Sequence, residues 1–158
     1  MLSFGRLLSV LLLLVVGLQA APLAQPEWNR VDVPAMKTSI YVGSVTLTTS
    51  AFKRDGETFA ATYAAKVFPW FFWGETGRIT INVSNDDLKK LQRGERMEFT
   101  GEAFSHKSKP RHVTGYADPA AGGATGKIKV RIAVDDVELI FNGPYQLSIF
   151  DVQASSAQ

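Results

Sequence analysis

The sequence predicts an all-β domain with one short helix, folded as an antiparallel β-sandwich or as a partly closed β-barrel of about seven strands. Apolar and polar residues alternate along several short segments, which is the period of a strand with one buried face. Turn residues separate these segments at steady intervals, and only one stretch has helical spacing. Because the outward positions are polar, each sheet is expected to have one face in water.

Residues 1–20 are predicted to be a secretory signal peptide. Arg6 precedes the apolar run 7–16, and small residues lie around the cleavage expected after position 20. The run is shorter than the roughly 18–20 residues that a spanning helix needs, which disfavours a membrane anchor. Residues 21–35 are predicted to be an extended leader, with Trp28 as its contact to the domain.

The composition favours a bacterial protein of the periplasm or cell envelope. The chain has no cysteine, whereas small secreted eukaryotic domains more often carry disulfides. Its 158 residues suffice for one domain, predicted over 36–152 and followed by a disordered tail at 153–158. Without Arg6 the 17 basic residues become 16 against 15 acidic, a net charge of +1. That balance does not indicate nucleic-acid binding, and no later stretch is predicted to span a membrane as a helix.

The first half of the domain is predicted to be strands. Along 36–49 the apolar residues change parity at Gly43, which indicates a β-bulge or a bend. Asp55 and Gly56 then predict a hairpin turn. The next strand, 58–68, is rich in alanine, with Ala61 and Ala65 on its inward face, so a large group is expected to pack over it.

One short helix is predicted after an alternating strand at 78–83. Ser84 or Asn85 can cap it, and two aspartates lie in the first turn, where the helix dipole favours acidic groups. Leu88 and Leu91 share one face, which is expected to be buried. Gly94 is expected to end the helix.

The second half is predicted to contain five more strands. A hairpin with a basic tip joins the first two, and 127–134 is the clearest alternating strand of the chain. Residues 137–141 form a further strand. Asn142-Gly143-Pro144 is expected to turn the chain into a last strand at 145–152.

The most unusual stretch has five aromatic rings in six positions, 68–73. If strand alternation holds there, Phe68, Trp70 and Phe72 face the core while Phe71 and Trp73 face outward. Most of the segment is therefore expected to be structural. The residues proposed to bind a ligand are Trp70, Phe71 and Trp73, with Trp70 on either side according to the bend at Pro69.

The second candidate site is the basic loop of the hairpin, with Lys107, Lys109 and Arg111. It is proposed to meet an anionic partner such as a lipid headgroup, a lipopolysaccharide phosphate or an acidic glycan; the alternative is an ordinary exposed turn. Neighbouring positive charges disfavour a metal site at His106 and His112. No metal and no cofactor is predicted.

These observations predict a secreted protein that is not an enzyme and binds a hydrophobic, glycan or protein partner through the aromatic segment. Thiol chemistry is excluded by the absence of cysteine, and no Gly-x-Ser-x-Gly sequence is present. Two alternatives remain open. One is a structural or assembly module of the envelope with no small ligand, and the other is a small hydrolase with paired carboxylates.

Overall fold

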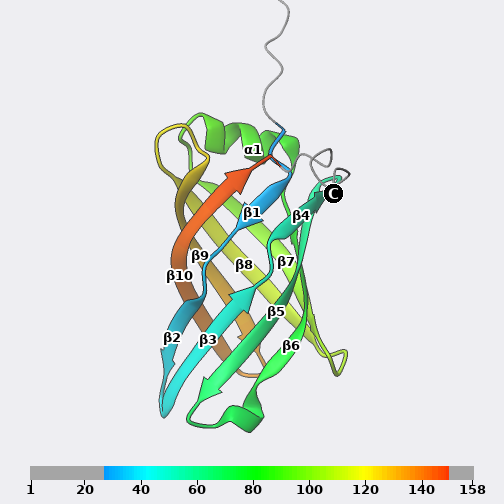
Figure 1. Cartoon of the computed structure of the whole chain (residues 1–158), viewed down its shortest axis with the longest axis vertical. Coiled ribbons are helices and arrows are strands. Elements are labelled where there is room, and N and C mark those ends of the chain that lie inside the picture. Colours follow the sequence, from blue (N-terminus) through cyan, green and yellow to red (C-terminus); the bar gives the residue numbers. More distant parts are fainter. Residues whose placement is uncertain (1–26, 150–158) are drawn as a thin grey trace, which may run out of the picture.

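The computed structural model describes residues 27–149, which form ten β-strands, one α-helix and one short 3-10 helix (Figure 1). The strands are β1 (Arg30–Asp32), β2 (Met36–Ile40), β3 (Gly43–Thr49), β4 (Phe52–Asp55), β5 (Thr58–Phe68), β6 (Glu75–Asn82), β7 (Met97–Ser105), β8 (Pro110–Pro119), β9 (Thr125–Val134) and β10 (Val137–Ser148). The helices are η1 (Phe71–Trp73) and α1 (Asn85–Gln92). The predicted signal peptide and tail lie outside the described residues.

Eight strands close into an antiparallel barrel. Hydrogen bonds join β1, β4, β5, β6, β7, β8, β9 and β10 in that order, and β10 pairs with β1 again. Closure depends on β5, because one edge of it pairs with both β3 and β4 and the other edge pairs with β6. The strands β2 and β3 extend the wall outside this ring. The predicted all-β class with one short helix is confirmed, and the sheet takes the form of a barrel.

Alternation places the apolar side chains inside the barrel. On β7 every second residue is buried from one end of the strand to the other. Gly115 on β8 lies opposite Phe99 on β7, and a Cβ at position 115 would come within 2.5 Å of that ring. Glycine is therefore needed there, because it leaves room for a large inward side chain on the neighbouring strand.

The barrel wall is interrupted on one side, where two strands break next to each other. Residues 33–35 separate β1 from β2, and residues 50–51 separate β3 from β4. On this edge β10 pairs with β1 only through 146–148, and the rest of β10 has no ladder partner there within the described chain. Met36 of β2 lies against Gly143 of β10 instead. A seam closed by side chains therefore runs between β2 and β10.

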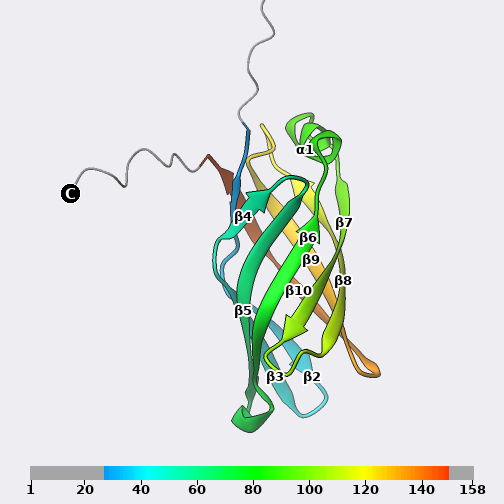
Figure 2. The ribbon, with the colours of Figure 1, turned by 90° about the vertical axis from the view of Figure 1, so that its right-hand side faces the viewer.

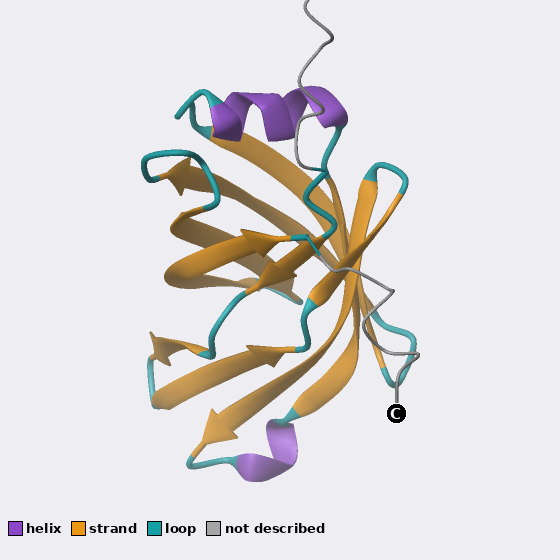
Figure 3. Cartoon of the chain, turned by 45° about the horizontal axis from the view of Figure 1, so that its top comes forward, coloured by secondary structure: helices purple, strands orange, loops and turns teal. Residues whose placement is uncertain are grey.

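The helix α1 covers one end of the barrel, which we call the upper end (Figure 3). The Ser84 hydroxyl accepts a hydrogen bond from the Asp87 N–H at 3.2 Å, and the Asp87 carboxylate accepts one from the Ser84 N–H at 3.1 Å. This reciprocal cap satisfies two backbone donors that a helix start leaves free. Leu88 and Leu91 are buried against the barrel interior. The predicted helix and its cap are confirmed.

Two turns differ from the prediction. The change of parity at Gly43 marks a hairpin and not a bulge, because Tyr41 and Val42 form a tight turn between the antiparallel strands β2 and β3. Residues 142–144 do not turn the chain, and β10 runs straight through them. Pro144 is tolerated there because β10 has a ladder on one edge only at this point.

The described part of the predicted leader belongs to the barrel. Trp28 is buried, and the Asn29 N–H donates to the Ser148 carbonyl at 3.2 Å. Strand β1 then pairs with both β10 and β4. The first and last described residues consequently lie near each other at the upper end, far from η1 (Figure 2).

Candidate functional site

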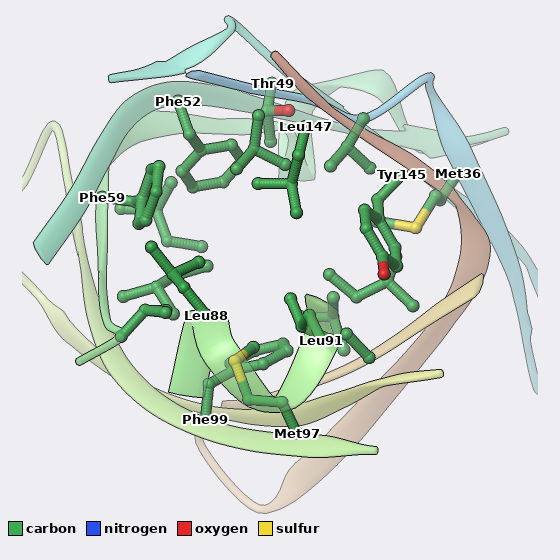
Figure 4. Close-up of a pocket in the computed structure, with 18 of the residues that line it drawn as sticks. Met36, Thr49, Phe52, Phe59, Leu88, Leu91, Met97, Phe99, Tyr145 and Leu147 are labelled. Carbon is green, nitrogen blue, oxygen red and sulfur yellow. The ribbon is translucent and has the colours of Figure 1, made fainter. Parts of the chain in front are cut away.

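The barrel interior contains an apolar cavity of about 60 Å³ in its upper half (Figure 4). Aliphatic and aromatic side chains line it, including Phe52, Phe59 and Phe99, and α1 contributes Leu88 and Leu91. Protein cores have few voids larger than a water molecule, which occupies roughly 10–15 Å³ on this measure. The fold thus leaves room for an apolar group that residues 27–149 do not supply.

A second cavity of about 30 Å³ continues toward the opposite, lower end. Leu47 and Ile79 line both cavities, so the two lie in series along the barrel. Small inward side chains help to leave this space open, because Ala65 and Ala103 line the lower cavity and Ala117 lines the upper one. The alanines of β5 predict a large neighbour, but at Ala65 the structure has a cavity instead. Alanine at inward positions was the sequence signal for this site.

Thr49 brings an unpartnered polar atom to the cavity wall. Its Oγ1 is buried and has no hydrogen-bond partner among the described residues (Figure 4). The other hydroxyl on the wall, that of Tyr145, donates to the Gly123 carbonyl at 3.2 Å. Burial raises the pKa of Tyr145 to about 12, so this hydroxyl stays protonated. The Thr49 hydroxyl is therefore available to a ligand.

The upper cavity lies directly behind the break in the barrel wall. A groove on the outer surface, beside residues 33–35 and 50–51, shares Val33, Thr49 and Tyr145 with the cavity. These three side chains separate the interior from solvent at this point. A ligand passing here would displace side chains and leave the strand ladders of the barrel in place.

An ion cluster around the buried Arg111 closes the lower end. Arg111 is only 7% exposed and donates from Nη2 to Glu75 at 3.0 Å and from Nη1 to Asp135 at 3.1 Å. The Tyr63 hydroxyl donates to the other oxygen of Glu75 at 2.5 Å. Since these residues come from β5, β6, β8 and the turn after β9, the cluster ties four segments together.

The protonation states of this cluster follow from its contacts. Burial by itself raises the pKa of Glu75, but the hydrogen bonds from Arg111 and Tyr63 outweigh it, so this pKa lies below its ordinary value. The hydrogen bond to Glu75 raises the pKa of Arg111. Burial, and then the bond to Glu75, raises the pKa of Tyr63. Glu75 is thus an anion, Arg111 a cation and Tyr63 neutral around neutral pH.

Five exposed aromatic side chains form a projection at the lower end, which we call the aromatic tip. Its members are Phe68, Trp70, Phe71, Phe72 and Trp73. Their exposed fractions run from 41% at Trp70 to 75% at Phe72. The rings contact one another, with centroids 5.5 to 6.0 Å apart. A cis peptide precedes Pro69, and the Trp73 N–H donates to the Trp70 carbonyl at 3.0 Å to form η1.

The expectation that Phe68, Trp70 and Phe72 face the core is wrong. Phe68 follows the buried Val67 on β5 and so points outward. Beyond Pro69 the chain forms a 3-10 turn, in which strand alternation no longer applies. All three residues proposed from the sequence, Trp70, Phe71 and Trp73, are at the surface, and the two other rings join them.

The structure divides the proposed basic loop. Lys107 and Lys109 lie exposed on the turn between β7 and β8, whereas Arg111 is buried in the ion cluster and is not available to a partner. The turn is fixed near the aromatic tip, because the His106 N–H donates to the carbonyl of Thr76 at the start of β6 at 2.7 Å. The two sites proposed separately from the sequence therefore share one end of the barrel.

A metal site or a hydrolase with paired carboxylates requires acidic or histidine side chains to gather at one place. Within residues 27–149, no three His, Asp or Glu side chains gather in a way that holds a metal ion. Glu75 and Asp135 come together around one cation, because both accept a hydrogen bond from Arg111. A carboxylate whose pKa is lowered by a guanidinium stays ionised and cannot be the proton donor that glycoside hydrolysis needs.

Comparison of the chain with protein-family models, with curated proteins and with solved structures finds no match. Within the described residues, no helix has the length and apolar character needed to cross a membrane. The function is therefore inferred from the geometry and chemistry of the chain.

Proposed function

We propose that this chain is a secreted, non-enzymatic protein of the bacterial periplasm or cell envelope that binds a slender apolar ligand, such as an acyl chain, inside its barrel. The apolar cavity beneath α1 is the observation that carries this proposal. An interior site removes ligand surface from water on all sides, which contributes about 25 cal/mol per Å² of apolar area. The apolar run after Arg6 and the absence of cysteine support the location.

The shape of the interior favours an unbranched chain. The two cavities are small, about 60 and 30 Å³, and lie in series with Leu47 and Ile79 between them. A longer ligand requires these walls to move apart. Met36 and Met97 line the upper cavity, and unbranched thioether side chains adapt readily to the shape of what they contact.

Replacing Ala117 with leucine should fill the upper cavity and weaken the binding of a fluorescent fatty-acid probe by about tenfold or more, which is about 1.4 kcal/mol. Ala117 is 3% exposed and lies on the cavity wall, so the added carbons occupy space that the ligand would use. Titration of the probe's fluorescence gives the dissociation constant.

Thr114→Leu is the matched control for this experiment. Thr114 belongs to the same strand as Ala117 but lines a groove on the outer surface, so its replacement should leave probe affinity unchanged. Urea unfolding verifies that both variants are folded. If Ala117→Leu binds the probe as tightly as the unmodified protein does, the barrel interior is not the site.

Replacing Thr49 with valine should raise the free energy of unfolding by about 1 kcal/mol. The change is nearly isosteric and removes a buried hydroxyl that has no hydrogen-bond partner among the described residues. It should also abolish any preference for a hydroxylated acyl chain over the plain chain. Urea unfolding and probe competition measure the two effects, and a loss of stability would show that the hydroxyl is already satisfied in solution.

The other functions left open by the sequence receive less support from the geometry. A purely structural module gains nothing from an interior void, because a void costs packing energy. A hydrolase that uses Glu75 lacks a protonated carboxyl there, because the hydrogen bonds from Arg111 and Tyr63 keep the pKa of Glu75 below its ordinary value. The aromatic tip projects outward, whereas sites for small ligands are concave, so the cavity is the better candidate for such a ligand.

A further inference from the structure

We propose that the lower end of the barrel docks on an anionic lipid bilayer, with the aromatic tip inserted among the headgroups. The proposal goes beyond ligand binding and does not depend on it, because it concerns exposed side chains at the end opposite α1 (Figure 2). Three properties of the lower end support the proposal: its exposed apolar side chains, its positive charge and its projecting shape.

The apolar surface at this end extends past the aromatic tip. The turn between β2 and β3 carries Tyr41, which is fully exposed, and Val42, which is 55% exposed. This turn lies beside the tip, because Ser44 pairs with Phe68 across the β3–β5 ladder. Contiguous exposed patches of large apolar side chains are uncommon on soluble monomers and mark surfaces that contact a protein or a membrane.

The charges at this end complement an anionic surface. Four exposed cations there form no ion pair with any described residue: Lys66, Arg78, Lys107 and Lys109. Two nearby acids pair with Arg111: Glu75, whose side chain is 23% exposed, and Asp135, whose side chain is 73% exposed. Asp136 is exposed on the turn after β9 and reduces the positive excess without cancelling it.

The residue types and the shape favour a bilayer over a protein partner. Trp and Tyr rings combine an apolar body with a polar N–H or O–H, and they concentrate where hydrocarbon meets water. Lysines beside such rings are attracted to anionic headgroups. The 3-10 turn that carries the tip projects beyond the ends of β5 and β6, so it can enter a soft interface without a complementary groove (Figures 1 and 2).

Flotation with lipid vesicles tests the proposal directly. The unmodified protein should float with vesicles of phosphatidylglycerol and far less with vesicles of phosphatidylcholine. Salt at about 0.5 M, well above physiological ionic strength, should weaken its binding to phosphatidylglycerol. Trp70 and Trp73 should shift their emission to the blue on binding, while the buried Trp28 should contribute a constant background.

Two variants separate the apolar from the electrostatic contribution. Phe71→Ser with Phe72→Ser should reduce partitioning to phosphatidylglycerol by about tenfold or more, since both rings are over 70% exposed and their loss leaves the core intact. Lys107→Gln with Lys109→Gln should reduce it by roughly tenfold on anionic vesicles only. Ile149→Ser should change nothing and is the control, because Ile149 is an apolar residue at the upper end that is 56% exposed.

The proposal is overturned if the protein does not float with anionic vesicles, or if the double serine variant floats as well as the unmodified protein. It is also overturned if the tip instead holds two copies of the chain together, which would appear as a dimer that the double serine variant converts to a monomer without any vesicle binding. Ala117→Leu should float normally, so a failure of ligand binding inside the barrel leaves this test unaffected.

Discussion

Replacing Glu75 with leucine should lower the free energy of unfolding by about 3–5 kcal/mol, the usual result of removing one partner from a buried ion pair. Arg111 has 8% of its side chain exposed and would keep only Asp135, whose side chain is 73% exposed. The Tyr63 hydroxyl would lose its acceptor as well. Urea unfolding measures the change as a lower transition midpoint at constant slope.

A second substitution shows whether the loss of stability comes from the charge of Arg111 that is left without Glu75. Glu75→Leu combined with Arg111→Met should recover most of the stability, because well-packed apolar side chains can replace a buried ion pair without loss. The matched control is Arg96→Met, which breaks the bidentate pair with Asp118 at the surface. That pair is about half exposed, so its loss should cost about 1 kcal/mol or less. If Glu75→Leu also lowers the free energy of unfolding by only about 1 kcal/mol or less, the ion cluster does not stabilise the lower end of the barrel.

The parts of the fold that depend on local chemistry were predictable from the sequence. Alternation located the buried face of β6, where Ile79 and Ile81 are buried, and it continues to the buried Val83 just after the strand. Ser84 and the acids after it located the start of α1, because capping depends on residues within one helical turn. Asp55-Gly56 located a hairpin turn for the same reason.

Closure of the barrel was not predictable, because it depends on pairings between distant segments. One edge of β5 is shared between β3 and β4, and β10 joins β1, more than 100 residues away along the chain. Arg111 was assigned to an exposed loop for a related reason. Its partners Glu75 and Asp135 lie far away in the sequence, and only the closed barrel brings the three together.

The aromatic segment and the cavity show two different limits of pattern-based prediction. Parity fails at the tip because the backbone leaves the extended conformation after Pro69, so the pattern no longer says which ring faces inward. The cavity, in contrast, does leave a signal in the sequence, the inward alanines of β5, but this signal was interpreted as room for a large neighbouring group. Small residues on an inward face predict either a large neighbour or empty space, and only the packing of opposite strands decides between them.

Replacing Leu91 with alanine should lower the free energy of unfolding by about 2–5 kcal/mol, and an apolar ligand should restore part of that loss. Leu91 is 2% exposed and projects from α1 onto the upper cavity, so truncation removes buried contacts and enlarges an existing void. Apolar cavities of this kind stay dry and bind small hydrophobic molecules. A ligand that binds only the folded state raises the unfolding temperature in proportion to the logarithm of its concentration.

Thermal unfolding with and without a short-chain alcohol or benzene separates a ligand site from ordinary core packing. In Leu91→Ala the ligand should raise the unfolding temperature more than in the unmodified protein, because the enlarged cavity accepts it with less displacement of the walls. Val113→Ala is the control, since Val113 is fully buried but does not line the upper cavity. Val113→Ala should be less stable than the unmodified protein, and the ligand should raise its unfolding temperature no more than it raises that of the unmodified protein. Equal gains in the two variants would show that the ligand fills whatever void is made, and that the space beneath α1 is not a site preformed by the fold.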